Sequence, residues 1–125
     1  MPAPEVEALL LRAREDLQAA RHSLSGGFVR AALNRAYHSA LQAARAALLG
    51  KGESPKTHTG VRNRLGLCFV LTGDLAPEIA EILNTAETLR NQADYEALAV
   101  FDERGAEDLL RDVERFVMAV ERLIA

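Results

Sequence analysis

Residues 28–49 constrain the fold more than any other segment, because they read as one helix that is apolar around most of its circumference. Eight of these residues are alanine. A thin polar seam at four-, four-, four- and three-residue spacing is formed by Arg30, Asn34, His38, Gln42 and Arg45, and Arg35 and Ser39 flank it. A helix with so little polar surface is typically buried among others, and small side chains let its neighbours approach closely. We therefore expect this segment at the centre of a helical bundle.

Four other segments repeat apolar residues at three- and four-residue spacing, which predicts four further helices. Two of them run over about 5–23 and 57–71. Another starts within 74–78 and ends at Arg90, and the last runs from a cap at Asp102 to about 124. Asp74 is the expected cap of the helix that ends at Arg90, and a looser stretch follows from about Ala93. We expect an all-α fold, an antiparallel up-and-down bundle of four long helices plus a shorter fifth, with residues 1–125 forming a single domain.

Charge is distributed unevenly along the chain, although the net charge is only −3. Residues 22–73 hold seven basic residues and one acid, whereas residues 74–125 hold five basic and thirteen acidic residues. Two interpretations stay open. The basic and acidic segments form surfaces for different partners, or they attract each other across the bundle.

Several classes of site are not expected. Cys68 is the single cysteine, which rules out an intramolecular disulfide and a multi-cysteine zinc site, and we expect it to be buried as a small hydrophobe. The three histidines do not match a zinc pattern, so neither a metal nor a cofactor is predicted. Neither a motif for reading DNA nor a signal peptide is visible, and no segment approaches the ~20 apolar residues of a membrane span. We expect a cytoplasmic protein.

Three short polar stretches interrupt the apolar pattern, at 34–38, 56–61 and 90–95, each on a different expected helix or its edge. Helix bundles build sites from side chains on facing helices. We therefore predict that these stretches share one ligand-binding site. The candidate residues are Arg35, Tyr37, His38, Lys56, Thr57, His58, Arg90, Asp94 and Tyr95.

The second and third stretches each have two interpretations. At 56–61 a loop enters a helix, where free amide groups favour an anion; the alternative is simple capping by Thr57 or Thr59. In the structural interpretation of 90–95, Arg90 lies near a helix end and interacts with the last carbonyls of that helix or pairs with Asp94, while Tyr95 packs on the bundle. The functional alternative is that Arg90 binds a phosphate and Tyr95 stacks on a base.

In order and spacing, these stretches resemble the HEPN family (higher eukaryotes and prokaryotes nucleotide-binding), in particular its small stand-alone prokaryotic branch. The resemblance rests on residues 13–20, 34–40, 43–49, 56–61, 72–75 and 90–95. It implies a bundle of four to five helices that forms homodimers, with a site near the dimer interface that handles nucleotides or RNA. It also implies a partner, a minimal nucleotidyltransferase, in a toxin–antitoxin-type pair. The small residues and polar seam of 28–49 suit such a two-fold contact.

The resemblance breaks at one position. Ribonuclease members of the family carry an arginine followed, four to six residues later, by a histidine that does acid–base chemistry on the RNA 2′-hydroxyl. Arg90 matches the arginine, but Tyr95 stands five residues on and no histidine follows His58. A phenol, with a pKa of ~10, is a poorer proton shuttle near neutral pH than an imidazole.

We therefore expect a nucleotide- or RNA-binding module. One alternative is a variant metal-independent ribonuclease that uses Arg90 with Tyr95, with His58 or with another histidine from a different helix. A second alternative is a purely structural protein-interaction bundle.

Overall fold

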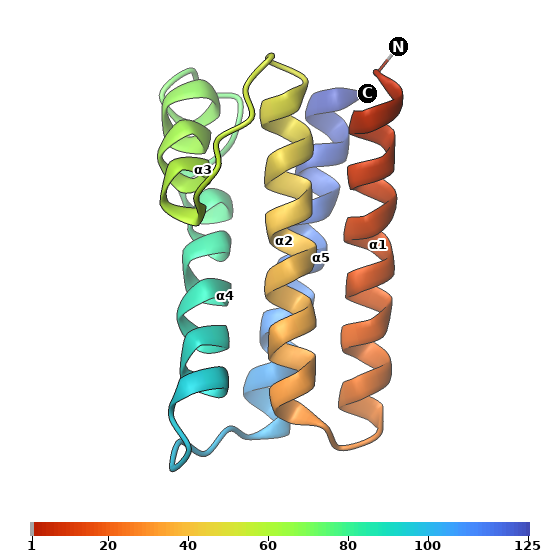
Figure 1. Cartoon of the computed structure of the whole chain (residues 1–125), viewed down its shortest axis with the longest axis vertical. Coiled ribbons are helices and arrows are strands. Elements are labelled where there is room, and N and C mark those ends of the chain that lie inside the picture. The colour runs from red at the N-terminus through yellow and green to blue at the C-terminus, as the bar shows by residue number, and fades with distance from the viewer. Residues whose placement is uncertain (1) are drawn as a thin grey trace.

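Four long helices and one short one form the protein in the computed structural model, which describes residues 2–125. The elements are α1 (Pro4–Ser25), α2 (Val29–Leu49), α3 (His58–Leu65), η1 (Gly66–Val70), α4 (Pro77–Tyr95) and α5 (Glu103–Ile124). Consecutive long helices alternate in direction (Figure 1). No strand occurs within residues 2–125. The expected all-α bundle of four long helices plus a shorter fifth is confirmed.

α2 lies at the centre, as its composition predicted. It contacts α1, α3, α4 and α5, and 13 of its 21 residues are buried. Seven of its eight alanines are buried against the rest of the same chain, so those seven are not available for the two-fold contact suggested for them. The homodimer itself stays a prediction.

The connection between α2 and α3 runs back along α2 before α3 begins (Figure 1). Thr57 ends this connection as the N-cap of α3, and its Oγ1 accepts a hydrogen bond of 2.9 Å from the Gly60 N–H. The capping role expected of Thr57 or Thr59 therefore falls to Thr57. Because the chain doubles back, the first residue of α3 lies beside the middle of α2 rather than at its end.

The expected helix at 57–71 changes its winding part-way. Regular α-helix stops at Leu65, and η1 continues as a π-helical turn in which the Leu71 N–H donates to the Gly66 carbonyl at 3.0 Å. Gly73, with a φ of 82°, then reverses the chain. That left-handed conformation is easy only for glycine, which agrees with the helix stop expected there.

Two predictions about α4 are wrong. Asp74 does not cap it, because the N-cap is Ala76 and the Asp74 carboxylate instead accepts the Thr72 hydroxyl at 2.7 Å. Nor does the helix end at Arg90, since it continues to Tyr95.

Arg30 accounts for the extension of α4. Its guanidinium donates to the carbonyl of Ala93 inside the helix and, at 2.6 Å, to that of Ala99 in the following loop. It also lies over the Phe101 ring, 5.2 Å from its centroid. These bonds satisfy carbonyls that a helix end leaves without partners. At the far side of the loop Asp102 caps α5 as expected, accepting the Gly105 N–H at 2.6 Å.

Cys68 differs from its expected environment. The side chain is only partly buried, and its thiol donates to Glu53 Oε2 at 3.1 Å. This hydrogen bond to the Glu53 carboxylate, together with burial, raises the pKa of the Cys68 thiol. The thiol has a polar partner because the connection after α2 carries Glu53 back onto this face.

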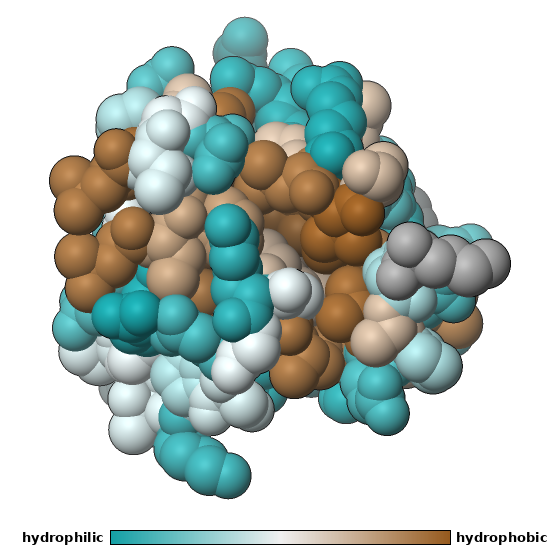
Figure 2. Space-filling model, turned by 90° about the horizontal axis from the view of Figure 1, so that it is seen from above, coloured by the Kyte–Doolittle hydropathy of each residue, from teal (hydrophilic) through white to brown (hydrophobic). Residues whose placement is uncertain are grey.

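Apolar side chains also reach the surface at the end of the bundle where the termini lie. Figure 2 looks onto this end and shows a hollow surrounded by apolar residues. A cavity of about 340 Å³ lies here between Val6, Phe69 and Ile124, among others. Within residues 2–125, no helix is both long and apolar enough to cross a membrane.

The two segments of opposite charge do meet, but sparingly. Arg62 of the basic segment pairs with Glu87 of the acidic one at 2.9 Å. The carboxylates Glu114 and Glu121 of α5 instead pair with Arg14 of α1. Only some of the charged residues pair between the two segments, so their mutual attraction explains the uneven charge distribution only in part.

Candidate functional site

Tyr37 lies where the three polar stretches meet. Its side chain is only 1% exposed. The His58 ring meets it edge-on with centroids 5.5 Å apart, and the His38 ring lies at 5.6 Å. The Arg90 guanidinium sits over the same ring, 5.2 Å from its centroid, an arrangement that favours the cation. One residue from each of α3 and α4 thus reaches the middle of α2.

Glu87 ties this group together. Its carboxylate accepts the Tyr37 hydroxyl at 3.2 Å and the Arg62 Nη1 at 2.9 Å, and its Oε2 lies 3.6 Å from His58 Nδ1. Burial, reinforced by the Glu87 charge, raises the pKa of Tyr37, so the phenol stays protonated.

Neither Glu87 nor Arg62 was among the candidates from the sequence. The sequence does contain one signal for Glu87. It precedes Arg90 by three residues, and residues three apart share a helix face.

Arg90 is largely enclosed. Its side chain is 17% exposed, and its Nε lies 3.2 Å from Asp94 Oδ2. That contact lacks hydrogen-bond geometry, so among residues 2–125 the buried Nε–H has no acceptor. Asp94 is shared with α2, because it also accepts the Asn34 amide at 3.2 Å. The Arg90–Asp94 pairing foreseen in the structural interpretation is present.

His38, on α2 itself, lies beside Tyr37 in this group. Burial lowers the pKa of His38, and the positive charges of Arg35 and Arg90 lower it further. Its imidazole is therefore neutral at neutral pH. Arg35 itself pairs with Asp16 of α1 at 3.3 Å, at the edge of the group.

Three candidates lie outside this group. Tyr95 ends α4 with 77% of its surface exposed, so it does not pack on the bundle. Thr57 is occupied as the cap of α3. Lys56 lines a separate hollow with Arg45, beside the connection after α2.

We refer to the residues around Tyr37 as the Tyr37 cluster. Its members are Tyr37, His38, His58, Arg62, Glu87, Arg90 and Asp94.

The Tyr37 cluster is rich in hydrogen-bonding groups but nearly balanced in charge. Arg62 faces Glu87 and Arg90 faces Asp94. The cluster offers guanidinium N–H groups, a phenol and two imidazoles, which can hold a phosphate oxygen and move a proton. No group of three metal-ligating side chains occurs in the described part of the chain.

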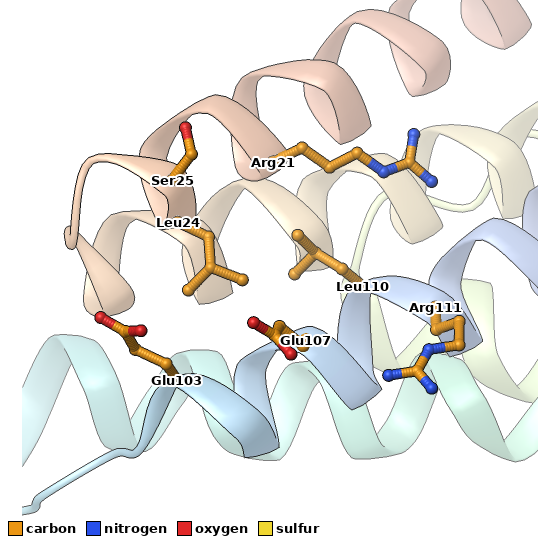
Figure 3. Close-up of a pocket in the computed structure, with 7 residues that line it drawn as sticks. All are labelled: Arg21, Leu24, Ser25, Glu103, Glu107, Leu110 and Arg111. Atoms are coloured by element: carbon orange, nitrogen blue, oxygen red, sulfur yellow. The ribbon is translucent and has the colours of Figure 1, made fainter.

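Another hollow, of about 510 Å³, lies between the end of α1 and the start of α5 (Figure 3). Glu103 and Glu107 of α5 lie across from Leu24 and Ser25 of α1. None of the candidate residues lines it. The hollow therefore adds nothing to the candidate site.

Comparison with known proteins identifies the family. The family model described as the HEPN domain matches residues 6–123. This chain belongs to the HEPN family. The resemblance inferred from its polar stretches is confirmed.

Three curated relatives of this HEPN protein each match 90% or more of its length. A "UPF0332 protein" of Thermotoga maritima is 35% identical over 113 residues, covering 90% of this chain and 86% of the relative. "Putative toxin MJ0605" of Methanocaldococcus jannaschii is 33% identical over 120 residues, covering 96% and 89%. "Putative toxin MJ0142" of the same organism is 31% identical over 120 residues, covering 96% and 82%.

This HEPN protein departs from the ribonuclease pattern after Arg90, and the structure shows where its imidazoles lie instead. Arg90 sits over the Tyr37 ring, and two imidazoles, one from α2 and one from the start of α3, lie beside the same ring. Tyr95, five residues after Arg90, points to solvent instead. An imidazole therefore lies near Arg90 without the histidine that the usual spacing would supply.

Proposed function

We propose that this HEPN protein binds single-stranded RNA at the Tyr37 cluster, as a homodimeric, toxin-like component paired with a minimal nucleotidyltransferase. The observation that carries the RNA site is the convergence on Tyr37 of polar groups from three helices, with the Arg90 Nε–H left without an acceptor in the described part of the chain. Membership of the HEPN family and relatives named as putative toxins support the toxin-like role.

A phosphate oxygen is the expected partner of Arg90 and Arg62. Guanidinium groups present planar donors that match phosphate geometry. In the free protein these donors face Asp94 and Glu87, so a bound phosphate exchanges places with a carboxylate. Tyr95, exposed at the end of the same helix, offers a ring for a base to stack on.

Replacing Arg90 with alanine is expected to weaken binding of a fluorescein-labelled single-stranded RNA octamer by about tenfold or more. A hydrogen bond to a charged group contributes ~1.5–3 kcal/mol, and 1.4 kcal/mol is a factor of ten in affinity. Fluorescence anisotropy at low salt measures the change, and circular dichroism verifies that the variant is folded.

Arg115→Ala is the matched control, because Arg115 is exposed on α5 and, among residues 2–125, pairs only with Asp112 one turn away. It removes the same charge from outside the cluster and is expected to bind normally. Equal affinities for the wild type and Arg90→Ala would contradict the proposal. Equal losses in both variants would also contradict it, since they would reflect net charge alone.

A second candidate function, metal-independent ribonuclease, is favoured by the His58–Glu87 contact. A carboxylate that orients an imidazole is the usual partner of a general base. In this mechanism His58 removes the proton of a 2′-hydroxyl, and the 2′-oxygen bonds to the adjacent phosphorus. The bond to the 5′-oxygen breaks and that oxygen takes up a proton, which leaves a 2′,3′-cyclic phosphate and a 5′-hydroxyl.

For this second candidate, cleavage of a mixed single-stranded RNA in EDTA is expected to fall at least ~100-fold in His58→Ala, the range that general acid–base catalysis supplies. Gel electrophoresis of end-labelled RNA measures it. His22→Ala, an exposed histidine of α1, is expected to cleave normally. Intact RNA after incubation with the wild type would exclude the ribonuclease and leave the binding function.

A further inference from the structure

A polyanion needs more uncompensated positive charge than the Tyr37 cluster supplies, since Arg62 and Arg90 in that cluster already face carboxylates. A second group of cations lies nearby, in a hollow of about 310 Å³ between α1, α2 and the connection after α2. We call this hollow the Arg45–Lys56 pocket. Its lining residues are Leu9, Arg45, Leu49, Glu53, Ser54, Pro55 and Lys56.

The pocket has one carboxylate, Glu53, and its charge is balanced by Arg64, which lies outside the pocket. Glu53 receives two hydrogen bonds from Arg64, at 2.5 and 2.6 Å. These bonds, with a further one from the Cys68 thiol, lower the pKa of Glu53 to about 2. Glu53 therefore stays ionised but is committed to Arg64.

Arg45 and Lys56 are left with their charges uncompensated. Neither forms an ion pair with any residue in the described chain. Lys56 is exposed and Arg45 is half-buried, so both are open to a ligand in the pocket.

The pocket is separate from the Tyr37 cluster but lies further along the same helix, α2. Arg45 follows His38 by seven residues on the same helix face, which places its Cα about 10 Å further along the axis. Burial is the main cause of the raised pKa of Tyr37, and the positive charge of Arg45 lowers that pKa. One phosphate cannot span such a distance, whereas successive phosphates of a nucleic-acid strand can.

We propose that the Arg45–Lys56 pocket is a second phosphate subsite. The ligand of this protein is then an RNA strand that carries several phosphates, with one held at Arg90 and another between Arg45 and Lys56, rather than a mononucleotide. This inference rests on the proposed RNA-binding function and adds the class of ligand to it.

The test compares two ligands, a fluorescein-labelled single-stranded RNA octamer and uridine monophosphate. The double variant Arg45→Ala/Lys56→Ala is expected to bind the octamer at least ~10-fold more weakly while its affinity for the mononucleotide is unchanged. The dependence of log affinity on log salt is expected to become shallower by about 1.4, because each contact to a single strand contributes ~0.7. Anisotropy measures the octamer and calorimetry the mononucleotide.

Two controls accompany it. Arg104→Ala/Arg122→Ala removes the same charge from exposed positions of α5 and is expected to bind both ligands normally. Arg45→Gln/Lys56→Gln keeps much of the length of each side chain, so it tests the pocket even if the alanine pair does not fold.

The outcomes separate this inference from the function on which it rests. If the double variants keep octamer affinity while Arg90→Ala loses it, the second subsite is wrong and RNA binding at the cluster stands. If the double variants lose affinity for both ligands equally, the subsite is also wrong, because the pocket then acts on the first site. If Arg90→Ala binds both ligands normally, the proposed function itself is overturned.

Discussion

Replacing Tyr37 with alanine is expected to lower the free energy of unfolding by about 3–5 kcal/mol, the range for truncating a large buried aromatic side chain. Tyr37 is among the largest fully buried side chains in the described structure. Its ring also contacts the rings of His38 and His58 and the Arg90 guanidinium. The truncation therefore opens a cavity at the point where α2, α3 and α4 meet.

Tyr37→Phe separates the ring from the hydroxyl. It keeps the packing and removes only the hydrogen bond to Glu87, which retains Arg62 as a partner. We expect a loss of about 1 kcal/mol. Urea denaturation followed by circular dichroism measures both variants, and Tyr95→Ala, exposed on α4, should stay within ~0.5 kcal/mol of the wild type. A phenylalanine variant as unstable as the alanine variant would show that the hydrogen bond, not the packing, is decisive.

Ala40→Leu is expected to destabilise the protein by about 3 kcal/mol, towards the upper end of the range for overpacking a close-packed core. Ala40 is 0% exposed, near the middle of α2. Other helices of the chain pack around α2, so three extra carbon atoms can be accommodated only if a neighbouring helix moves.

Ala31→Leu is the matched control, because Ala31 is exposed on the same helix. Alanine and leucine have similar helix propensities, so this variant should unfold at nearly the wild-type urea concentration. Thermal and urea denaturation of the two variants give the comparison. If both substitutions had the same small effect, α2 would not be as tightly enclosed as its burial indicates.

The sequence was sufficient for the features that depend on local periodicity. Apolar spacing identified each helix, and the eight alanines of α2 predicted its central position because a helix with so little polar surface must be enclosed. The Asp102 cap also followed from sequence, since a capping side chain and the backbone N–H that donates to it lie within one turn. The end of α4 did not, because Arg30, more than 60 residues earlier in the chain, supplies the donors that extend it.

The composition of the candidate site depended on the path of the chain between helices. The connection after α2 doubles back, which brings His58 to Tyr37 and leaves Lys56 in a separate pocket with Arg45. Glu87 and Arg62 joined the site, and Tyr95 did not, because of which faces α3 and α4 turn towards α2. Periodicity fixes which residues share a face of one helix. Only the packing of the helices against each other determines which faces meet.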